Sequence, residues 1–309
     1  MSAKSTYRIR NWSEYNRSLV NRGNLTVWID KEAVAGWHSV EATGKKGRTA
    51  TYSDLAIETA LTLRGLLKFP LRQTQGFLEG LFSMLSLRLD APSYSTLSRR
   101  AEELLVEIPR IQWSEPINLL IDGSGLKVFG EGEWKMRVHG KQKRRTWRKI
   151  HIGISRESQE VLAVTLTESN VHDSMETAAL LSQVDSLASV TGDKAYDNRN
   201  AHAPIAAKGD RAIIPPRSGA ALKTKTISWG DVERNRLIRE KHLLGNDAWK
   251  TGSGYTRRVL VETAFCRYKK ILGPMLHGRK LSTQKTEVRL AAKILNKMTQ
   301  LGMPDSYKS

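Results

Sequence analysis

The sequence feature that most constrains the fold is a short apolar run that ends in a carboxylate. Residues 117–121 read Ile-Asn-Leu-Leu-Ile, and Asp122 follows directly, before a Gly-Ser-Gly segment. A run this short, with Pro116 before it and glycines after it, is typical of a buried strand. In α/β sheets, ligands bind at the carboxyl ends of strands. The sequence therefore predicts a sheet with an acidic group at a strand end.

The pattern after Pro116 predicts a mixed α/β sheet with helices on its faces. We expect strands at 147–155, 160–168, 190–196 and 211–215, and helices at 173–184, 231–244, 254–272 and 285–301. The stretch 218–252 as a whole is too irregular to place, and we interpret it as a short insertion. The α/β domain is expected to occupy residues 113–309.

The chain before this domain reads as mainly helical. Its first fifty residues look irregular, and helices are predicted at 53–67, 71–87 and 94–106, separated by proline-containing breaks. Three helices joined by tight breaks suit a helix-turn-helix at about 53–106, whose last helix would offer Arg99 and Arg100 to DNA. A plain three-helix cap explains the same pattern equally well. We assign residues 1–112 to an N-terminal helical DNA-binding region.

The charge of the chain favours a polyanionic partner. There are 50 Lys and Arg against 31 Asp and Glu, a formal net charge of +19. Solubility alone needs a net charge of only about 2–8 in a small domain, so nucleic acid is the first candidate. A basic run at 141–149 is expected to hold the DNA backbone, although a solvated loop is the ordinary explanation of such a run. Its candidate DNA-binding residues are Lys143, Arg144, Arg145, Arg148 and Lys149.

Several protein classes are excluded by what the sequence lacks. The single Cys266 excludes a disulfide framework and any multi-cysteine metal site. No apolar run approaches the roughly 18 residues of a membrane span. The N-terminus has no apolar stretch of the kind found in secretory signals. A soluble cytoplasmic protein is expected.

Two further acidic residues join Asp122 as candidates. Asp193 follows Val-Thr-Gly, a second apolar strand end, and Glu262 lies on the helix predicted at 254–272. Residues seven apart on a helix differ by only about 20°, so Glu262 shares one line with an aromatic residue and a lysine. An arginine one turn earlier lies about 40° off this line. A solvent-exposed helix that carries ordinary surface ion pairs explains this ordered set poorly.

The four residues of this helix, Tyr255, Arg258, Glu262 and Lys269, have a familiar spacing. It resembles the Tyr-x2-Arg-x3-Glu-x6-Lys signature of bacterial insertion-sequence transposases of the DDE class. Further similar blocks lie at 11–30, 120–125, 144–151, 170–174 and 192–197, so the resemblance covers nearly the whole chain.

The resemblance implies a fold, a metal and a set of site residues. The fold is a ribonuclease-H-like catalytic domain at 113–309, in which Asp122, Asp193 and Glu262 bind two Mg²⁺ ions, with Mn²⁺ able to substitute. Tyr255, Arg258 and Lys269 would then contact DNA. For His172 and Asp173 a supporting role beside the site and a simple helix cap are both open.

The resemblance also implies an activity and partners. The protein would be a DNA transposase that binds the terminal inverted repeats of its element and catalyses strand cleavage and strand transfer into target DNA. Its partner would be double-stranded DNA, and it would act as a homodimer or larger synaptic complex in the bacterial cytoplasm, associated with the nucleoid. In-line displacement at phosphorus suits a pair of metal ions about 3.5–4 Å apart, and hard divalent ions prefer oxygen ligands.

Two other functions stay open on the sequence. A DNA-binding regulator or inactive copy would not need three intact acidic residues. A structure-selective nuclease of the same fold would cut branched DNA without joining ends, and the Tyr-Arg-Glu-Lys spacing counts against it. Glycosidase chemistry from paired carboxylates explains neither the net charge nor the ordered cations.

Overall fold

The chain divides into two compact units. The structure, a computed structural model, describes residues 7–39, 51–109, 115–129, 147–225 and 228–308. One unit comprises Met1–Val106 with Lys293–Ser309, and the other comprises Glu107–Ala292. The boundary expected from the sequence lies near residue 112, with the whole C-terminal end in the α/β domain. The structure instead divides the long helix α13 (Leu281–Leu301) between the units.

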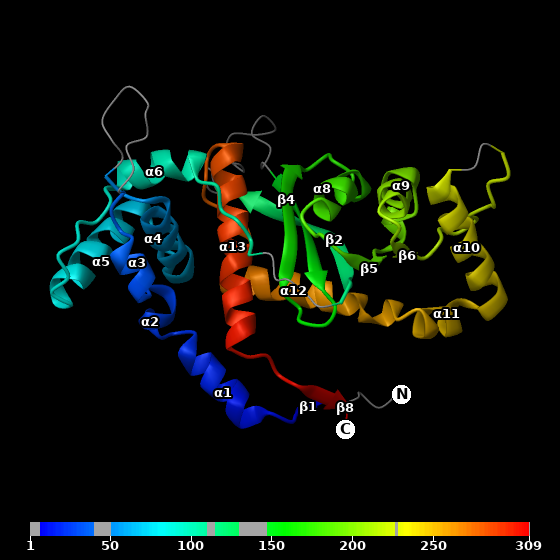
Figure 1. Cartoon of the computed structure of the whole chain (residues 1–309), viewed down its shortest axis with the longest axis horizontal. Helices are drawn as coiled ribbons and strands as arrows, with labels where there is room; N and C mark the ends of the chain where they lie inside the picture. The colour runs from blue at the N-terminus through cyan, green and yellow to red at the C-terminus, as the bar shows by residue number, and fades with distance from the viewer. Residues whose placement is uncertain (1–6, 40–50, 110–114, 130–146, 226–227, 309) are drawn as a thin grey trace, which may run out of the picture. The chain divides into compact units, whose positions relative to one another are not determined.

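The second unit is built on a six-stranded mixed sheet in the order β4-β3-β2-β5-β6, with β7 paired to β2 (Figure 1). β3 runs antiparallel to β2 and β4, whereas β5 runs parallel to β2 and β6, and β7 runs parallel to β2. The strands are β2 (Ile117–Val128), β3 (Trp147–Ser155), β4 (Val161–Glu168), β5 (Leu187–Thr191), β6 (Arg211–Ile213) and β7 (Met275–Leu276). The predicted mixed α/β class is confirmed.

The core on one face of this sheet is formed with four helices: α8 (Thr177–Leu181), α9 (Arg199–Ala207), α10 (Trp229–Leu244) and α11 (Asn246–Gly252). Leu119 and Ile121 of β2 are fully buried there, as are Leu237 of α10 and Trp249 of α11. The stretch interpreted as an insertion is therefore part of the core. Its pattern was hard to interpret because α10 exposes apolar residues, among them Trp229, on its outer side.

Side chains alternate across a strand, so Asp122 and Ser124 face the side of β2 opposite to Ile121. On that side β2 is packed by α12 (Val259–Ile271). The sequence predicts one helix over 254–272, but the structure has a 3-10 turn, η4 (Tyr255–Arg258), before α12 begins. This turn follows Gly254 in a left-handed conformation with φ +75°. The tighter winding of a 3-10 turn rotates Tyr255 off the line that joins Glu262 to Lys269.

Two other predicted elements differ in a similar way. The predicted helix at 173–184 begins as a 3-10 turn, η2 (Asp173–Glu176), before α8. The predicted strand at 190–196 ends at Thr191, and another 3-10 turn, η3 (Lys194–Tyr196), follows. Asp193 lies beyond the strand and caps η3, its side chain accepting a hydrogen bond from Ala195 N at 2.8 Å.

The first unit contains the three predicted helices: α4 (Asp54–Leu67), α5 (Leu71–Met84) and α6 (Tyr94–Glu103). Ser53 caps α4 by accepting a bond from Ala56 N at 3.1 Å, as its position suggests. Leu63, Leu78 and Leu97 are buried, one from each helix.

The expectation that the first fifty residues are irregular is wrong for the described part. They form β1 (Tyr7–Ile9), α1 (Trp12–Asn21), α2 (Leu25–Trp28) and α3 (Lys31–Ala35). β1 pairs with β8 (Ser306–Lys308), and Asn11 exchanges hydrogen bonds with Met303 O and Asp305 N. Trp37 is fully buried and packs edge-on against Phe82. Contacts to distant residues therefore order this segment.

Among the described residues, none of the helices combines the length and the hydrophobicity that a bilayer crossing requires.

The burial of Trp249, the one buried residue of α11, gives a direct test. The Trp249→Ala change should lower the free energy of unfolding by about 3–5 kcal/mol, because it empties a fully buried site. The matched change Trp229→Ala removes an indole that is 81% exposed and should cost less than about 0.5 kcal/mol. Urea denaturation followed by circular dichroism measures both, and equal effects would contradict this placement.

Candidate active site

The site begins with Asp122 at the centre of the sheet. One of its oxygens accepts a hydrogen bond from Gly123 N at 2.8 Å, and the other accepts one from Arg258 Nη1 at 2.9 Å. Burial raises the pKa of Asp122 above its ordinary value, and the charge of Asp193 adds to this effect. The hydrogen bonds from Gly123 and Arg258 offset it only in part. The carboxylate therefore lies in a partly buried position that disfavours its negative charge.

Strand pairing brings Asp193 to the same place. β2 and β5 run parallel, with Leu120 opposite Thr191. Asp122 and Asp193 each lie two residues beyond this pair. Asp193 follows the end of β5, as predicted, but Asp122 lies inside β2, which continues to Val128, so the prediction that it ends a strand is wrong. Because this register brings the two residues close together, the charge of Asp193 raises the pKa of Asp122.

Glu262 lies on α12 and is linked to Asp122 through Arg258. The Arg258 guanidinium gives one nitrogen to Asp122 and the other to Glu262, which lies one turn further along and is half exposed. Burial disfavours the charge of the guanidinium, but the neighbouring charges of Asp122, Glu262 and Asp193 raise the pKa of Arg258. Arg258 thus joins two of the three predicted acidic residues and lies in the field of the third.

The structure therefore places two of the predicted acidic residues, Asp122 and Glu262, against a cation of the chain itself. Within the described ranges, no three His, Cys, Asp or Glu side chains are grouped closely enough to hold a metal ion. The donor chemistry nevertheless fits a hard divalent ion, since carboxylate oxygens are its preferred ligands. A cation beside Asp122 and Asp193 would also relieve the charge repulsion that contributes to the raised pKa of Asp122.

The other two residues of the predicted helix signature border the same acidic residues. Lys269 Nζ donates to Ser124 Oγ at 2.6 Å, on the face of β2 that carries Asp122. Tyr255 is half-buried, its ring 5.8 Å from that of Trp249, and burial raises the pKa of its phenol. A cation and a neutral phenol are thus held beside the carboxylates.

Behind β2 lies a polar cluster that the sequence analysis identified only in part. Asp173 Oδ1 is 3.3 Å from Lys149 Nζ and 3.4 Å from Nδ1 of the fully buried His151. Burial alone would raise the pKa of Asp173, but the hydrogen bond from His151 and the charge of Lys149 lower it. A Cβ atom on Gly123 would lie 2.2 Å from Asp173 Oδ1. The cluster therefore packs directly on the backbone next to Asp122, and the glycine leaves room for it.

Of the two predicted supporting residues, Asp173 is the one in this cluster. His172 caps η2, with its Nδ1 2.9 Å from Ser174 Oγ. His151 was missed as a site residue, although it lies in one of the blocks on which the family resemblance was based. The signal that could have found it is its position opposite Gly123 in the β2–β3 pairing, which the sequence alone does not reveal.

The basic residues predicted to bind DNA have different environments. Lys143, Arg144 and Arg145 lie outside the described residues. Arg148 bonds to Gln284 and Glu168, and Lys149 donates to Val171 O at 2.8 Å besides contacting Asp173. In the first unit, Arg100 bonds to Tyr52 O and Asp54, whereas Arg99 is exposed on α6. The guanidinium groups of Arg148 and Arg100 thus already have partners within their own units.

Comparison with protein families identifies both parts of the chain. Two family models, each described as a transposase DDE domain, match it, one over residues 20–131 and the other over residues 113–297. The second match covers more than half of the 309 residues and includes Asp122, Asp193 and Glu262. No solved structure matches the chain.

The contact between Gly123 and Asp173 predicts a steric effect. The Gly123→Ala change should destabilise the protein by about 1–3 kcal/mol, because the new methyl group displaces the Asp173 carboxylate. Gly252→Ala is the matched control, since its Cβ would meet nothing within 4 Å and alanine favours a helix. Chemical denaturation compares the two, and a Gly123→Ala protein as stable as the wild type would contradict the contact.

The lowered pKa of Asp173 predicts a pH-dependent loss of stability. A carboxyl group with a lowered folded-state pKa stabilises the fold above its ordinary value of 3.8, and this stabilisation is lost as the pH falls through the folded-state pKa. The Asp173→Asn change should therefore cost about 1 kcal/mol at neutral pH, and the difference from the wild type should shrink in acid. Unfolding free energies measured from pH 7 downward test this, and a constant difference would contradict it.

Proposed function

The chain belongs to the DDE transposase family, and from that premise we propose that it is a DNA transposase. It binds the terminal inverted repeats of its element, cleaves DNA strands in a metal-dependent reaction and transfers them into target DNA. The family implies an enzyme of the nuclease or transposase class with a DNA substrate, and divalent metal ions are typical of it. The observation that supports the proposal is the β2–β5 register, whose last pair, Leu120 and Thr191, lies two residues before Asp122 and Asp193.

In the proposed enzyme, Asp122 and Asp193 hold the metal ions, and Glu262 completes the set from α12. Two bound divalent ions would supply an activated attacking oxygen and stabilise the leaving oxygen of the phosphodiester. Arg258 pairs with two of these carboxylates and offsets part of their negative charge while no substrate is bound. DNA phosphates offer Arg258 alternative oxygen acceptors, and this frees the carboxylates for the metal.

The remaining site residues position the DNA. Lys269, held by Ser124 beside Asp122, neutralises a phosphate of the reacting strand. Tyr255 packs its ring against the DNA end, supported from behind by Trp249. Both act on the face of β2 where the carboxylates lie, so the reacting phosphate is oriented from the α12 side.

We further propose that residues 1–112 bind the terminal repeats, with Arg99 of α6 and the basic run at 141–149 as contacts. The net charge of +19 supports a long phosphate interface. Cleavage and joining of two element ends would require a homodimer or larger complex.

The decisive experiment is an assay of end binding, strand cleavage and strand transfer on the DNA that flanks the encoding gene, with Mg²⁺ or Mn²⁺. Asp122→Ala, Asp193→Ala and Glu262→Ala should each abolish cleavage, because each removes a metal ligand. End binding, measured by gel shift, should persist in all three variants.

Glu240→Ala serves as the control for these variants, since Glu240 lies on α10, outside residues 1–112, and pairs with Arg236 and not with a site residue, so its loss should leave cleavage intact. Full cleavage by any of the three acidic variants would remove that residue from the site. Cleavage of branched DNA without joining of ends would favour a structure-selective nuclease.

A further inference from the structure

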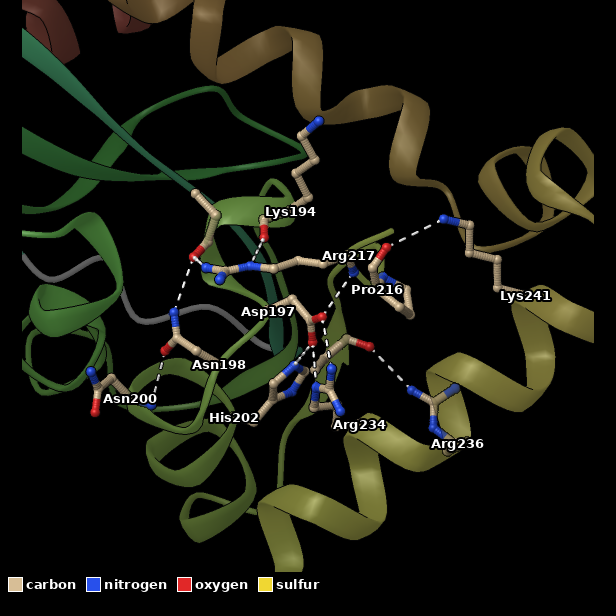
Figure 2. Close-up of polar contacts among 12 residues, drawn as sticks. Lys194, Asp197, Asn198, Asn200, His202, Pro216, Arg217, Arg234, Arg236 and Lys241 are labelled. Carbon is tan, nitrogen blue, oxygen red and sulfur yellow. Dashed lines mark hydrogen bonds and ion pairs between the residues drawn. The ribbon is translucent and has the colours of Figure 1, made fainter. Parts of the chain in front are cut away.

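A fourth acidic residue, Asp197, lies four positions after Asp193 and is bonded quite differently (Figure 2). Its side chain is only 1% exposed. Oδ1 accepts a hydrogen bond from Arg234 Nε at 2.7 Å and lies 3.3 Å from His202 Nε2, and Oδ2 accepts bonds from Arg217 N at 2.8 Å and Arg234 Nη2 at 3.1 Å. A carboxylate has about four acceptor positions. All are used within the unit, so Asp197 has none left for a metal ion or a substrate.

The donors come from three separate segments. His202 lies on α9, Arg217 on the loop after β6, and Arg234 on α10. Burial alone would raise the pKa of Asp197, but the bonds from His202, Arg234 and Arg217 lower it well below its usual range. The carboxylate is thus ionised at physiological pH and acts only as an acceptor, so His202 Nε2 is the donor in its contact.

The same residues enclose the turn that carries Asp193. Asp193 caps η3 at its beginning through Ala195 N, and Asp197 N donates to Lys194 O at its end. Arg217 extends over the turn, with Nε donating to Lys194 O at 3.2 Å and Nη2 to Ala195 O at 3.0 Å. Arg217 therefore bonds Asp197 through its backbone and the η3 carbonyls through its side chain (Figure 2).

From this geometry we propose that Asp197 is a positioning residue for Asp193. With Arg217, Arg234 and His202 it forms a clamp that fixes both ends of η3 and so fixes the direction in which the Asp193 carboxylate points. The inference rests on the proposed function, in which Asp193 is a metal ligand. It assigns the stretch after β6 and helix α10 a role in holding the active site.

Stability alone is a poor explanation of this clamp. Buried ion pairs often contribute no more to stability than apolar side chains of the same volume, because both charges lose their hydration. What a saturated carboxylate adds is fixed geometry among the segments that bond to it. Groups that orient metal ligands commonly change metal affinity or activity by about 10–100-fold when they are removed.

The test compares two clamp variants with a matched control. Asp197→Asn weakens the centre of the clamp. Arg217→Gln keeps the backbone bond to Asp197 but removes the side chain from η3, and because Arg217 is exposed this variant should fold. Glu240→Gln is the control, since it breaks an ion pair with Arg236 on the same helix without touching η3.

Two readouts separate positioning from folding. Hydrogen–deuterium exchange, measured without DNA or metal, should be faster at residues 193–198 in both clamp variants and unchanged in the control. The Mg²⁺ concentration that half-saturates cleavage should rise about 10–100-fold in the clamp variants, with end binding unchanged and part of the activity recovered at high Mg²⁺.

The outcomes are distinguishable. Faster exchange with an unchanged Mg²⁺ dependence would overturn the positioning role and leave the clamp as support for the fold. Unchanged exchange in Arg217→Gln and Asp197→Asn would overturn the clamp itself. If the wild-type protein cuts no flanking DNA, the proposed function fails, while the exchange comparison still decides whether the clamp holds the turn.

Discussion

The parallel pairing of β2 with β5 is the constraint on which the rest of the site depends. It brings Asp122, inside β2, and Asp193, just after β5, close enough for their negative charges to interact in a partly buried position. Such an arrangement costs free energy unless a positive charge accompanies it. Several side chains around Asp122 and Asp193 lower this cost or hold the two residues in place.

Arg258 supplies the positive charge that accompanies these carboxylates. It bonds to Asp122 and Glu262 together, which explains why the acidic residues are arranged around a guanidinium rather than as a compact metal-binding group among the described residues. A guanidinium suits this role because its planar fork serves two carboxylates at once. In a transposase the same group is suited to bind phosphate oxygens, so charge compensation and substrate recognition depend on one side chain.

The backbone around the acidic residues is held from two further directions. Behind β2, the Asp173 cluster packs on Gly123, the residue after Asp122. Beyond β5, Asp197 and its three partners enclose the turn after Asp193. Neither group presents a carboxylate to the site itself. The first packs against the residue after Asp122 and the second bonds to the turn after Asp193, so the backbone beside each acidic residue is held in place.

Local pattern predicted the regular elements well where burial is periodic. Helices α4, α5 and α6 and strands β3 and β4 lie close to the expected positions, since an apolar stripe or a short apolar run needs no distant partner to be recognised. Strand β2 begins where expected but continues past its apolar run to Val128, where it pairs with β3 and β7. The failures have the opposite cause. Asn11 is bonded to Met303 and Asp305 and Trp37 packs against Phe82, all distant in sequence, and α10 and α11 are ordered by a core to which they supply only a few buried residues.

The candidate site divides in the same way. The sequence by itself determined that apolar runs lead into Asp122 and Asp193, that a Tyr-Arg-Glu-Lys series has an ordered spacing, and that the protein carries a large positive charge. That the three acidic residues bind metal stays a prediction. Only the tertiary structure decided that Arg258 bonds to Asp122, 136 positions away, that Asp197 is saturated, and that Arg148 and Arg100 are already bonded. The reason is physical: periodicity reports whether a residue is buried, whereas the partner of a charge is set by strand register and helix packing between distant segments.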